Sequence, residues 1–240
     1  MAESKTYVLL HGAWHGGWCW RMVAEALRAQ GHRVTTPTQT GLGERRHLLS
    51  AQITLETFIA DLVGHIEAEE LTGVILVGHS FGGLAISGAA DRIPDRLRHL
   101  VYLDSLILEN GQAPFDAVLP EIAAARRALA REHGAGIAIP PPPVASFGIP
   151  EGHPLTPWVA QRLTPHPLGA YESPLHLRHR VGNGLPCTYI ACTEPPYAPL
   201  EPVRRWAKGR PGWAWQEIAT GHDAMITAPA ELARMLAAIG

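Results

Sequence analysis

The stretch VILVGHSFGG, residues 74–83, decides the fold of this chain. Its first four residues form a short, continuously apolar run, which is typical of a strand buried on both faces. The next five match the pattern G-x-S-x-G, and the small residues that follow predict a helix over 81–91. The pattern needs glycine on both sides of Ser80, because in so tight a turn a side chain there would collide with the neighbouring strand or helix. The stretch therefore predicts a strand–turn–helix unit with the Ser80 hydroxyl exposed at the turn.

Apolar runs and helical patterns alternate on both sides of this unit. Short apolar or β-branched runs predict strands, and apolar residues spaced three and four apart predict amphipathic helices. The strands are predicted at residues 7–10, 32–36, 74–77, 99–103, 187–193 and 213–218, and further helices at residues 22–30, 54–70 and 230–239. Because no hairpin signal joins the strands, we predict an α/β fold with a mostly parallel sheet flanked by helices.

The alternation is interrupted between residues 105 and 184. This stretch has one clear helical pattern, at about 117–133, followed by a proline-rich part that includes residues 140–143. It is too ordered for a linker and too irregular for another sheet unit. We therefore expect a single domain, with an α/β core of residues 1–104 and 185–240 and with residues 105–184 inserted as a helical cap, or lid, over the end of the sheet.

The composition excludes several classes of protein. With 46% hydrophobic and 18% charged residues, neither wholesale disorder nor a coiled-coil rod is expected. The chain has no run of about 18 apolar residues, which argues against a membrane span. Its 20 basic and 22 acidic side chains argue against nucleic acid as a partner. Cys19, Cys187 and Cys192 are too few and too scattered for a disulfide framework or a zinc site.

The N-terminal residues predict where in the cell the protein is located. The first apolar run follows directly after MAESK, which leaves no room for a signal peptide. We therefore expect a cytoplasmic protein without cofactor or metal that acts on a small molecule and not at a membrane. The sequence leaves open whether the chain forms a homodimer.

A serine hydroxyl is a poor nucleophile unless a base takes its proton, so Ser80 requires a histidine. Among 13 histidines, His222 directly follows the last predicted strand. Loops at the carboxyl ends of parallel strands open on one rim of the sheet, which predicts that His222 reaches Ser80 as the general base. His79 precedes the nucleophile and is expected to point back into the fold. His11 and His15 lie in a glycine-rich loop rather than on a helix, which argues against a metal site there.

Four segments carry a resemblance to a known family. They are HGAWHGGWCW (11–20), GHSFGG (78–83), YIACTE (189–194) and TGHDAM (220–225). Over nearly its whole length the chain resembles the α/β-hydrolase superfamily, and within it the small lidded branch of plant methylesterases and hydroxynitrile lyases and their bacterial esterase relatives. The resemblance implies an oxyanion hole formed by the backbone N–H groups of Ala13 and Phe81, which would stabilise a tetrahedral intermediate.

The acid that orients the histidine departs from the pattern of the plant relatives. In those relatives it follows the penultimate strand, where this chain reads CTEPPY, with prolines at the position expected for an aspartate. Glu194 remains a candidate there. Asp104 is the other candidate, because it ends the strand after the Ser80 helix, a placement similar to that in certain lipases and dehalogenases. We predict Asp104 as the acid of the triad, with Glu194 as the alternative.

A serine–histidine–acid triad performs acyl transfer through an acyl-serine, with water as the second nucleophile. The expected substrate is therefore a small carboxylic ester, such as a methyl or aryl ester or a lactone. Aromatic residues are expected either to line its pocket or to pack in the core. They are Trp14, Trp18, Phe81, Phe115 and Trp158. Trp14, which follows the oxyanion loop, is predicted to bind the substrate.

Two alternatives share this fold. A hydroxynitrile lyase-type C–C lyase is disfavoured, because those relatives have a threonine and a lysine where this chain has Gly12 and Asp223, and a negative Asp223 would repel cyanide. A non-catalytic ligand-binding member of the fold is disfavoured by the intact pair of Ser80 and His222. The formal net charge of −2 indicates no electrostatic preference for a charged substrate.

Overall fold

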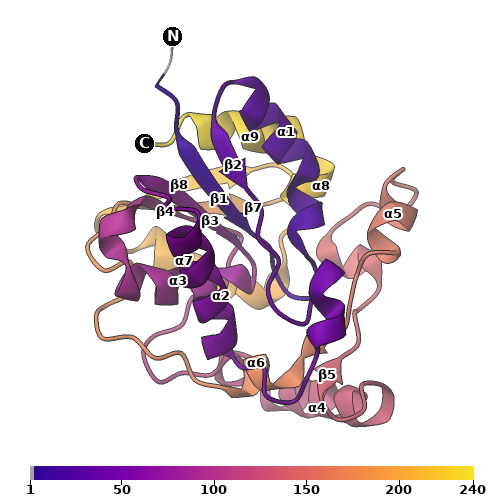
Figure 1. Ribbon diagram of the computed structural model, residues 1–240. Coiled ribbons are helices and arrows are strands. Elements are labelled where there is room, and N and C mark those ends of the chain that lie inside the picture. The colour runs from indigo at the N-terminus through magenta and orange to yellow at the C-terminus, as the bar shows by residue number, and fades with distance from the viewer. Residues whose placement is uncertain (1–2) are drawn as a thin grey trace.

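The computed structural model describes residues 3–240, so the first two residues of the expected core lie outside the described residues. A six-stranded sheet with the order β2-β1-β3-β4-β7-β8 crosses the molecule, and every neighbouring pair in it is parallel (Figure 1). Its strands are β1 (Thr6–Leu10), β2 (Arg33–Thr35), β3 (Val74–His79), β4 (Leu97–Leu103), β7 (Cys187–Cys192) and β8 (Trp213–Ile218). The predicted α/β architecture is confirmed.

Helices cover both faces of the sheet (Figure 1). One face carries α1 (Arg21–Ala29), α8 (Ala224–Thr227) and α9 (Pro229–Ala237), and the other carries α2 (Leu55–Ala68), α3 (Gly82–Arg92) and α7 (Glu201–Lys208). Successive strand residues point to opposite faces. Leu76 therefore packs in the core under α2 and α3, whereas Ile75 and Val77 pack in the core under α1 and α9. This burial on both faces explains why β3 is apolar without interruption.

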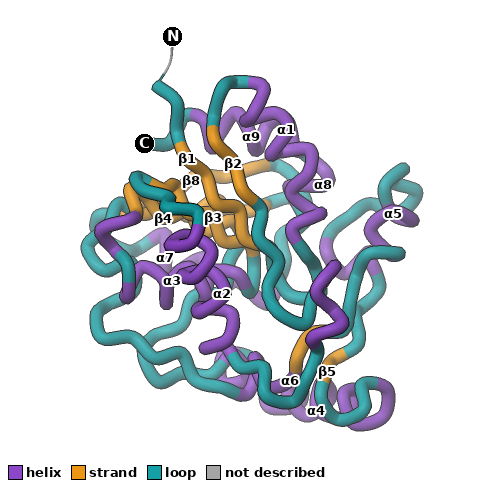
Figure 2. The backbone as a smooth tube through the Cα atoms, in the orientation of Figure 1, coloured by secondary structure: helices purple, strands orange, loops and turns teal. Residues whose placement is uncertain are grey.

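The chain between β4 and β7 forms no strand of the six-stranded sheet in the described residues. It consists mostly of loops and short helices beyond one end of the sheet (Figure 2). Its elements are α4 (Pro120–His133), β5 (Ala138–Ile139), α5 (Thr156–Ala160), β6 (His166–Pro167) and α6 (Leu168–Glu172). The expectation that this stretch contains no sheet unit is wrong in one detail, because β5 and β6 form a short antiparallel pair.

Two helices differ from the sequence patterns. The helix expected from residue 117 begins at Pro120, because residues 114–117 form a separate single turn. The patterns did not indicate α7. Its buried residues are Arg204 and Ala207, and an apolar periodicity cannot be recognised when one of its two buried positions is an arginine.

Within residues 3–240, no helix combines the length and the apolar character needed to cross a bilayer. The same residues contain no group of three or more histidine, cysteine, aspartate or glutamate side chains arranged to hold a metal ion.

Candidate active site

Ser80 lies in the tight turn between β3 and α3. Its φ of 52° falls in the left-handed region, which is uncommon for a residue with a side chain. A Cβ at Gly78 would lie 2.9 Å from the carbonyl oxygen of Gly82, and a Cβ at Gly82 would lie 2.6 Å from that of His11. Only glycine fits at these two positions. The turn holds Ser80 at the start of α3, where the helix N-terminus favours negative charge.

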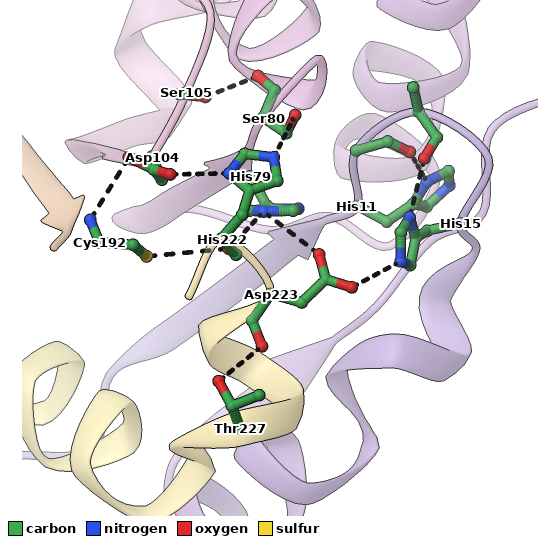
Figure 3. A network of polar contacts seen from close by, with 12 residues as sticks. His11, His15, His79, Ser80, Asp104, Ser105, Cys192, His222, Asp223 and Thr227 are labelled. Carbon is green, nitrogen blue, oxygen red and sulfur yellow. Dashed lines mark hydrogen bonds and ion pairs between the residues drawn. The ribbon is translucent and has the colours of Figure 1, made fainter. Parts of the chain in front are cut away.

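Three side chains from the ends of three strands meet at this turn (Figure 3). His222, in the loop after β8, places its Nε2 atom 2.9 Å from Oγ of Ser80, which is 142 positions away in sequence. Its Nδ1 atom lies 2.7 Å from Oδ2 of Asp104, which directly follows β4. An ionised carboxylate only accepts hydrogen bonds, so Nδ1–H donates to Asp104 and the unprotonated Nε2 faces the serine hydroxyl. In this arrangement an imidazole can remove the serine proton.

The second oxygen of Asp104 is held by other groups. Oδ1 accepts hydrogen bonds from Nε and Nη2 of Arg204, at 3.0 and 2.7 Å, and from the backbone N–H of Cys192 at 3.3 Å. Burial raises the pKa of Asp104, but the hydrogen bond and charge of His222, together with Arg204, outweigh it and hold that pKa below its usual value. Glu194 is exposed and makes no hydrogen bond or ion pair to His222 in the described part of the chain. Asp104 rather than Glu194 therefore lies beside His222.

A second histidine–aspartate pair lies next to the first one (Figure 3). Nε2 of His15 is 3.0 Å from Oδ2 of Asp223, and Nδ1 of His15 is 2.7 Å from the carbonyl oxygen of Ala13. Both ring nitrogens face oxygen acceptors, so His15 is an imidazolium paired with a buried carboxylate. Burial lowers the pKa of His15, but the charge of Asp223 together with the hydrogen bonds to Asp223 and to Ala13 outweighs it and raises that pKa above its usual value. The pair thereby connects the Ala13 loop to the residue after His222.

This pairing changes one argument made from the sequence. Asp223 is completely buried against His15 and does not line the pocket in front of Ser80. The prediction that its charge would repel cyanide is therefore wrong, because the charge is paired with His15 and Asp223 is not among the residues that line the pocket.

The remaining histidines of the site are structural. His79 points back into the fold as predicted, where Nε2 donates to the carbonyl oxygen of His222 at 3.0 Å. Burial lowers the pKa of His79 to about 3, so the ring is neutral. Nε2 of His11 accepts the backbone N–H of Gln39 at 3.1 Å, whereas His15 binds Asp223. His11 and His15 therefore do not form a common metal site.

Ala13 and Phe81, whose backbone N–H groups were predicted to form the oxyanion hole, line the same pocket as Ser80. In the described residues, neither of them donates to a backbone acceptor. The loop approaches the nucleophile closely, since a Cβ at Gly12 would lie 2.8 Å from Cβ of Ser80. Unpaired backbone donors at the same pocket as the serine are the kind of group that an oxyanion requires.

The pocket in front of Ser80 is lined mainly by apolar and aromatic side chains. Trp14 and Phe81 line it, as the sequence suggested. Phe115 is buried behind it and stacks on Tyr171. The rings of Trp18 and Trp158 pack against each other with centroids 5.1 Å apart, away from the pocket. For these last three residues the core-packing alternative holds, since Phe115 is buried and Trp18 and Trp158 are half-buried against the core.

Several lining residues were not anticipated from the sequence, among them Tyr197, Tyr171 and Arg126. Tyr197 stacks on His222, with ring centroids 4.3 Å apart and planes 21° from parallel. It belongs to the CTEPPY segment, which supplies this aromatic ring instead of the acid. Tyr171 and Arg126 approach from the chain between β4 and β7. No local pattern marks any of them, because their positions depend on how that chain folds back over the sheet.

Comparison with known proteins identifies the family of this chain. The profile of the "Alpha/beta hydrolase family" matches residues 7–235. "Carbendazim hydrolyzing esterase" from Nocardioides sp. (strain SG-4G) is 43% identical over 242 aligned residues, covering 98% of this chain and 99% of that one. "Putative methylesterase 14, chloroplastic" from Arabidopsis thaliana is 35% identical over 126 residues, covering 51% of this chain and 36% of that one. Among solved structures, an extracellular alpha/beta-hydrolase from a Paenibacillus species, described as sharing structural and functional homology with tobacco salicylic acid binding protein 2, has a TM-score of 0.79 at 25% identity, over 97% of both chains. This chain belongs to the alpha/beta hydrolase family.

Proposed function

We propose that the protein is a serine hydrolase that cleaves small carboxylic esters through an acyl-serine intermediate. The observation that carries the proposal is the continuous hydrogen-bonded line from Ser80 through His222 to Asp104, at 2.9 and 2.7 Å, on the floor of a pocket. The names of the relatives support it, because esterases and methylesterases are among them.

The reaction has two halves. In the first, Oγ of Ser80 attacks the ester carbonyl carbon and its proton passes to Nε2 of His222, while the N–H groups of Ala13 and Phe81 hold the oxyanion. The imidazolium, stabilised by Asp104, then protonates the leaving alcohol as the C–O bond breaks. In the second half, His222 takes a proton from water, the hydroxide attacks the acyl-serine, and the carboxylic acid leaves as Ser80 regains its proton.

The chain between β4 and β7 is proposed to act as a cap that determines specificity. Val118, Arg126, Phe147 and Tyr171 from this stretch line the pocket together with core residues. A cap that supplies much of the lining would decide which acyl and alcohol groups fit, whereas the core supplies the reacting groups.

The proposal is tested with Ser80→Ala and the matched control Ser4→Ala, which changes an exposed serine bonded to the carbonyl oxygen of Gly31. Loss of the nucleophile is expected to lower kcat for p-nitrophenyl butyrate by about 10⁴- to 10⁶-fold. The control should keep its activity, and both variants should keep the circular dichroism spectrum and Tm of the wild type. A fluorophosphonate should label wild-type Ser80 and no other residue by mass spectrometry.

Retained turnover in folded Ser80→Ala would overturn the mechanism. Absence of turnover in the wild type, with tight binding of the same esters, would instead favour a non-catalytic ligand-binding protein. Cyanide release from a cyanohydrin, without ester hydrolysis, would favour a lyase. Carbendazim belongs in the first substrate panel, because a relative is named for hydrolysing it.

A further inference from the structure

The pocket in front of Ser80 contains a cation and no carboxylate. Arg126 of α4 is a lining residue, and neither aspartate nor glutamate is among the others. Within residues 3–240 no carboxylate lies at ion-pair distance from Arg126, whereas its neighbour Arg127 pairs with Glu172 and the buried Arg204 pairs with Asp104. An unpaired charge in a partly desolvated site is costly, so a ligand that neutralises it is favoured there.

Aromatic rings hold the guanidinium group at the pocket wall. Cζ of Arg126 lies 5.0 Å from the ring centroid of Tyr171 and 5.8 Å from that of Trp14. Tyr197, which stacks on His222, is near enough for the charge of Arg126 to oppose the rise in its pKa that burial causes. Arg126 thus lies against the aromatic wall of the same pocket that His222 lines. Its side chain needs little further ordering when a ligand binds.

Arg127, the next residue of α4, also packs on an aromatic ring but has a carboxylate partner. Arg127 lies over Phe115, with Cζ 4.4 Å from the ring centroid, and its Nε donates to Oε1 of Glu172 at 2.8 Å. It does not line the pocket. Both arginines pack on aromatic faces, so cation–π packing alone does not require an unpaired charge in the pocket. Of these two arginines, only Arg126 lines the pocket, and it has no carboxylate partner within the described residues.

We propose that Arg126 binds a carboxylate carried by the substrate, so that the preferred substrates are esters with a second, ionised carboxyl group, such as monoesters of dicarboxylic acids. This inference rests on the proposed esterase function and names its substrate class. It reverses the sequence-based expectation of no electrostatic preference, since the net charge of −2 over the whole chain says nothing about the charge at the pocket.

The test compares esters of equal size that differ only in charge. The monomethyl esters of succinic, glutaric and adipic acid are each paired with the corresponding monoamide, which is neutral and has the same shape. A charge-assisted hydrogen bond to arginine predicts that kcat/KM for the best acid exceeds that for its amide by about 10- to 100-fold. Arg126→Met should reduce this ratio to about one, and Arg126→Lys should keep part of it because lysine keeps the charge but not the planar fork. Arg127→Met, the matched control, should leave the ratio unchanged.

The ratio of kcat/KM for the acid ester to that for its amide distinguishes a role of Arg126 in substrate specificity from a role in supporting the cap. If Arg126 only supported the cap, Arg126→Met would lower kcat/KM for acid and amide esters equally, and the inference would be overturned. It would also be overturned if the wild type hydrolysed the amide esters as well as the acid esters, an outcome that leaves the esterase proposal intact.

Calorimetry with the Ser80→Ala variant gives a readout that needs no turnover. Tighter binding of the acid esters than of the amide esters, lost on adding Arg126→Met, would support the carboxylate site even if the wild type hydrolysed no ester. Equal binding of the two would overturn it.

Discussion

Asp104→Asn tests whether the acid beside His222 works as the geometry indicates. The amide of the variant has two orientations, and the surroundings select one of them. Three hydrogen-bond donors, Nε and Nη2 of Arg204 and the backbone N–H of Cys192, face the Oδ1 position. The asparagine must therefore place its oxygen there and turn its NH₂ group toward Nδ1 of His222.

That orientation forces the wrong tautomer on the histidine. Facing an NH₂ donor, Nδ1 of His222 must accept, so the proton moves to Nε2, which lies 2.9 Å from Oγ of Ser80. A protonated Nε2 cannot take the serine proton, and the imidazolium also loses its counter-charge. In a serine hydrolase with this arrangement the same substitution lowers kcat by about 10⁴-fold. This corresponds to about 5.5 kcal/mol in the activation free energy.

The substitution also leaves the buried Arg204 without its anion. Loss of one partner of a buried ion pair typically costs about 3–5 kcal/mol in the free energy of unfolding. The assay therefore measures kcat for p-nitrophenyl butyrate and the urea midpoint of the same samples, so that loss of folded protein is not mistaken for loss of chemistry. The matched control is Glu194→Gln, which removes an exposed charge in the CTEPPY segment.

We expect Glu194→Gln to retain kcat within about twofold, because a surface charge without a partner contributes little. If folded Asp104→Asn kept kcat within tenfold of the wild type, or if Glu194→Gln lost as much as Asp104→Asn, the assignment of the acid would be refuted.

Two further predictions concern the surroundings of the triad. Burial lowers the pKa of His11 to about 3, so between that pH and about 6.5 only the unfolded chain binds its proton and stability rises with pH. Between pH 7 and pH 5, the free energy of unfolding measured by urea titration should fall by about 2 kcal/mol more for the wild type than for His11→Gln. Parallel pH profiles of the two proteins would contradict this. A Cβ at Gly12 would lie 2.8 Å from Cβ of Ser80 and 3.0 Å from Nδ1 of His79. Gly12→Ala should therefore displace the nucleophile and lower kcat by about 10- to 100-fold with intact folding; an unchanged kcat would show that the loop can move aside.

Much of the site follows from the position of residues relative to predicted strand ends. Ser80 was predicted because G-x-S-x-G lay between an apolar run and a run of small residues. His222 was predicted because it followed the last strand, and parallel strands end on one rim of the sheet. Asp104 was ranked above Glu194 for the same reason. These predictions needed only local patterns and the fact that a parallel sheet has one carboxyl edge.

Other features had no local signal. Arg204 is a buried side chain in a helix that the periodicity did not indicate, and its role appears only when α7 packs beside β7 and brings the guanidinium to Asp104. His15 and Asp223 are 208 positions apart, and nothing in either segment shows that their charges cancel.

The sequence by itself therefore determined the α/β fold and predicted Ser80 as the nucleophile, His222 as the base and a ranked choice of acid, because these depend on short patterns and on the common edge of the strands. Only the tertiary structure decided which carboxylate reaches His222, which aromatic rings line the pocket, and that Arg126 lies there with no carboxylate partner among residues 3–240. The physical reason is that these contacts form between segments far apart in sequence, and burial and charge pairing at such contacts depend on packing that no single segment encodes.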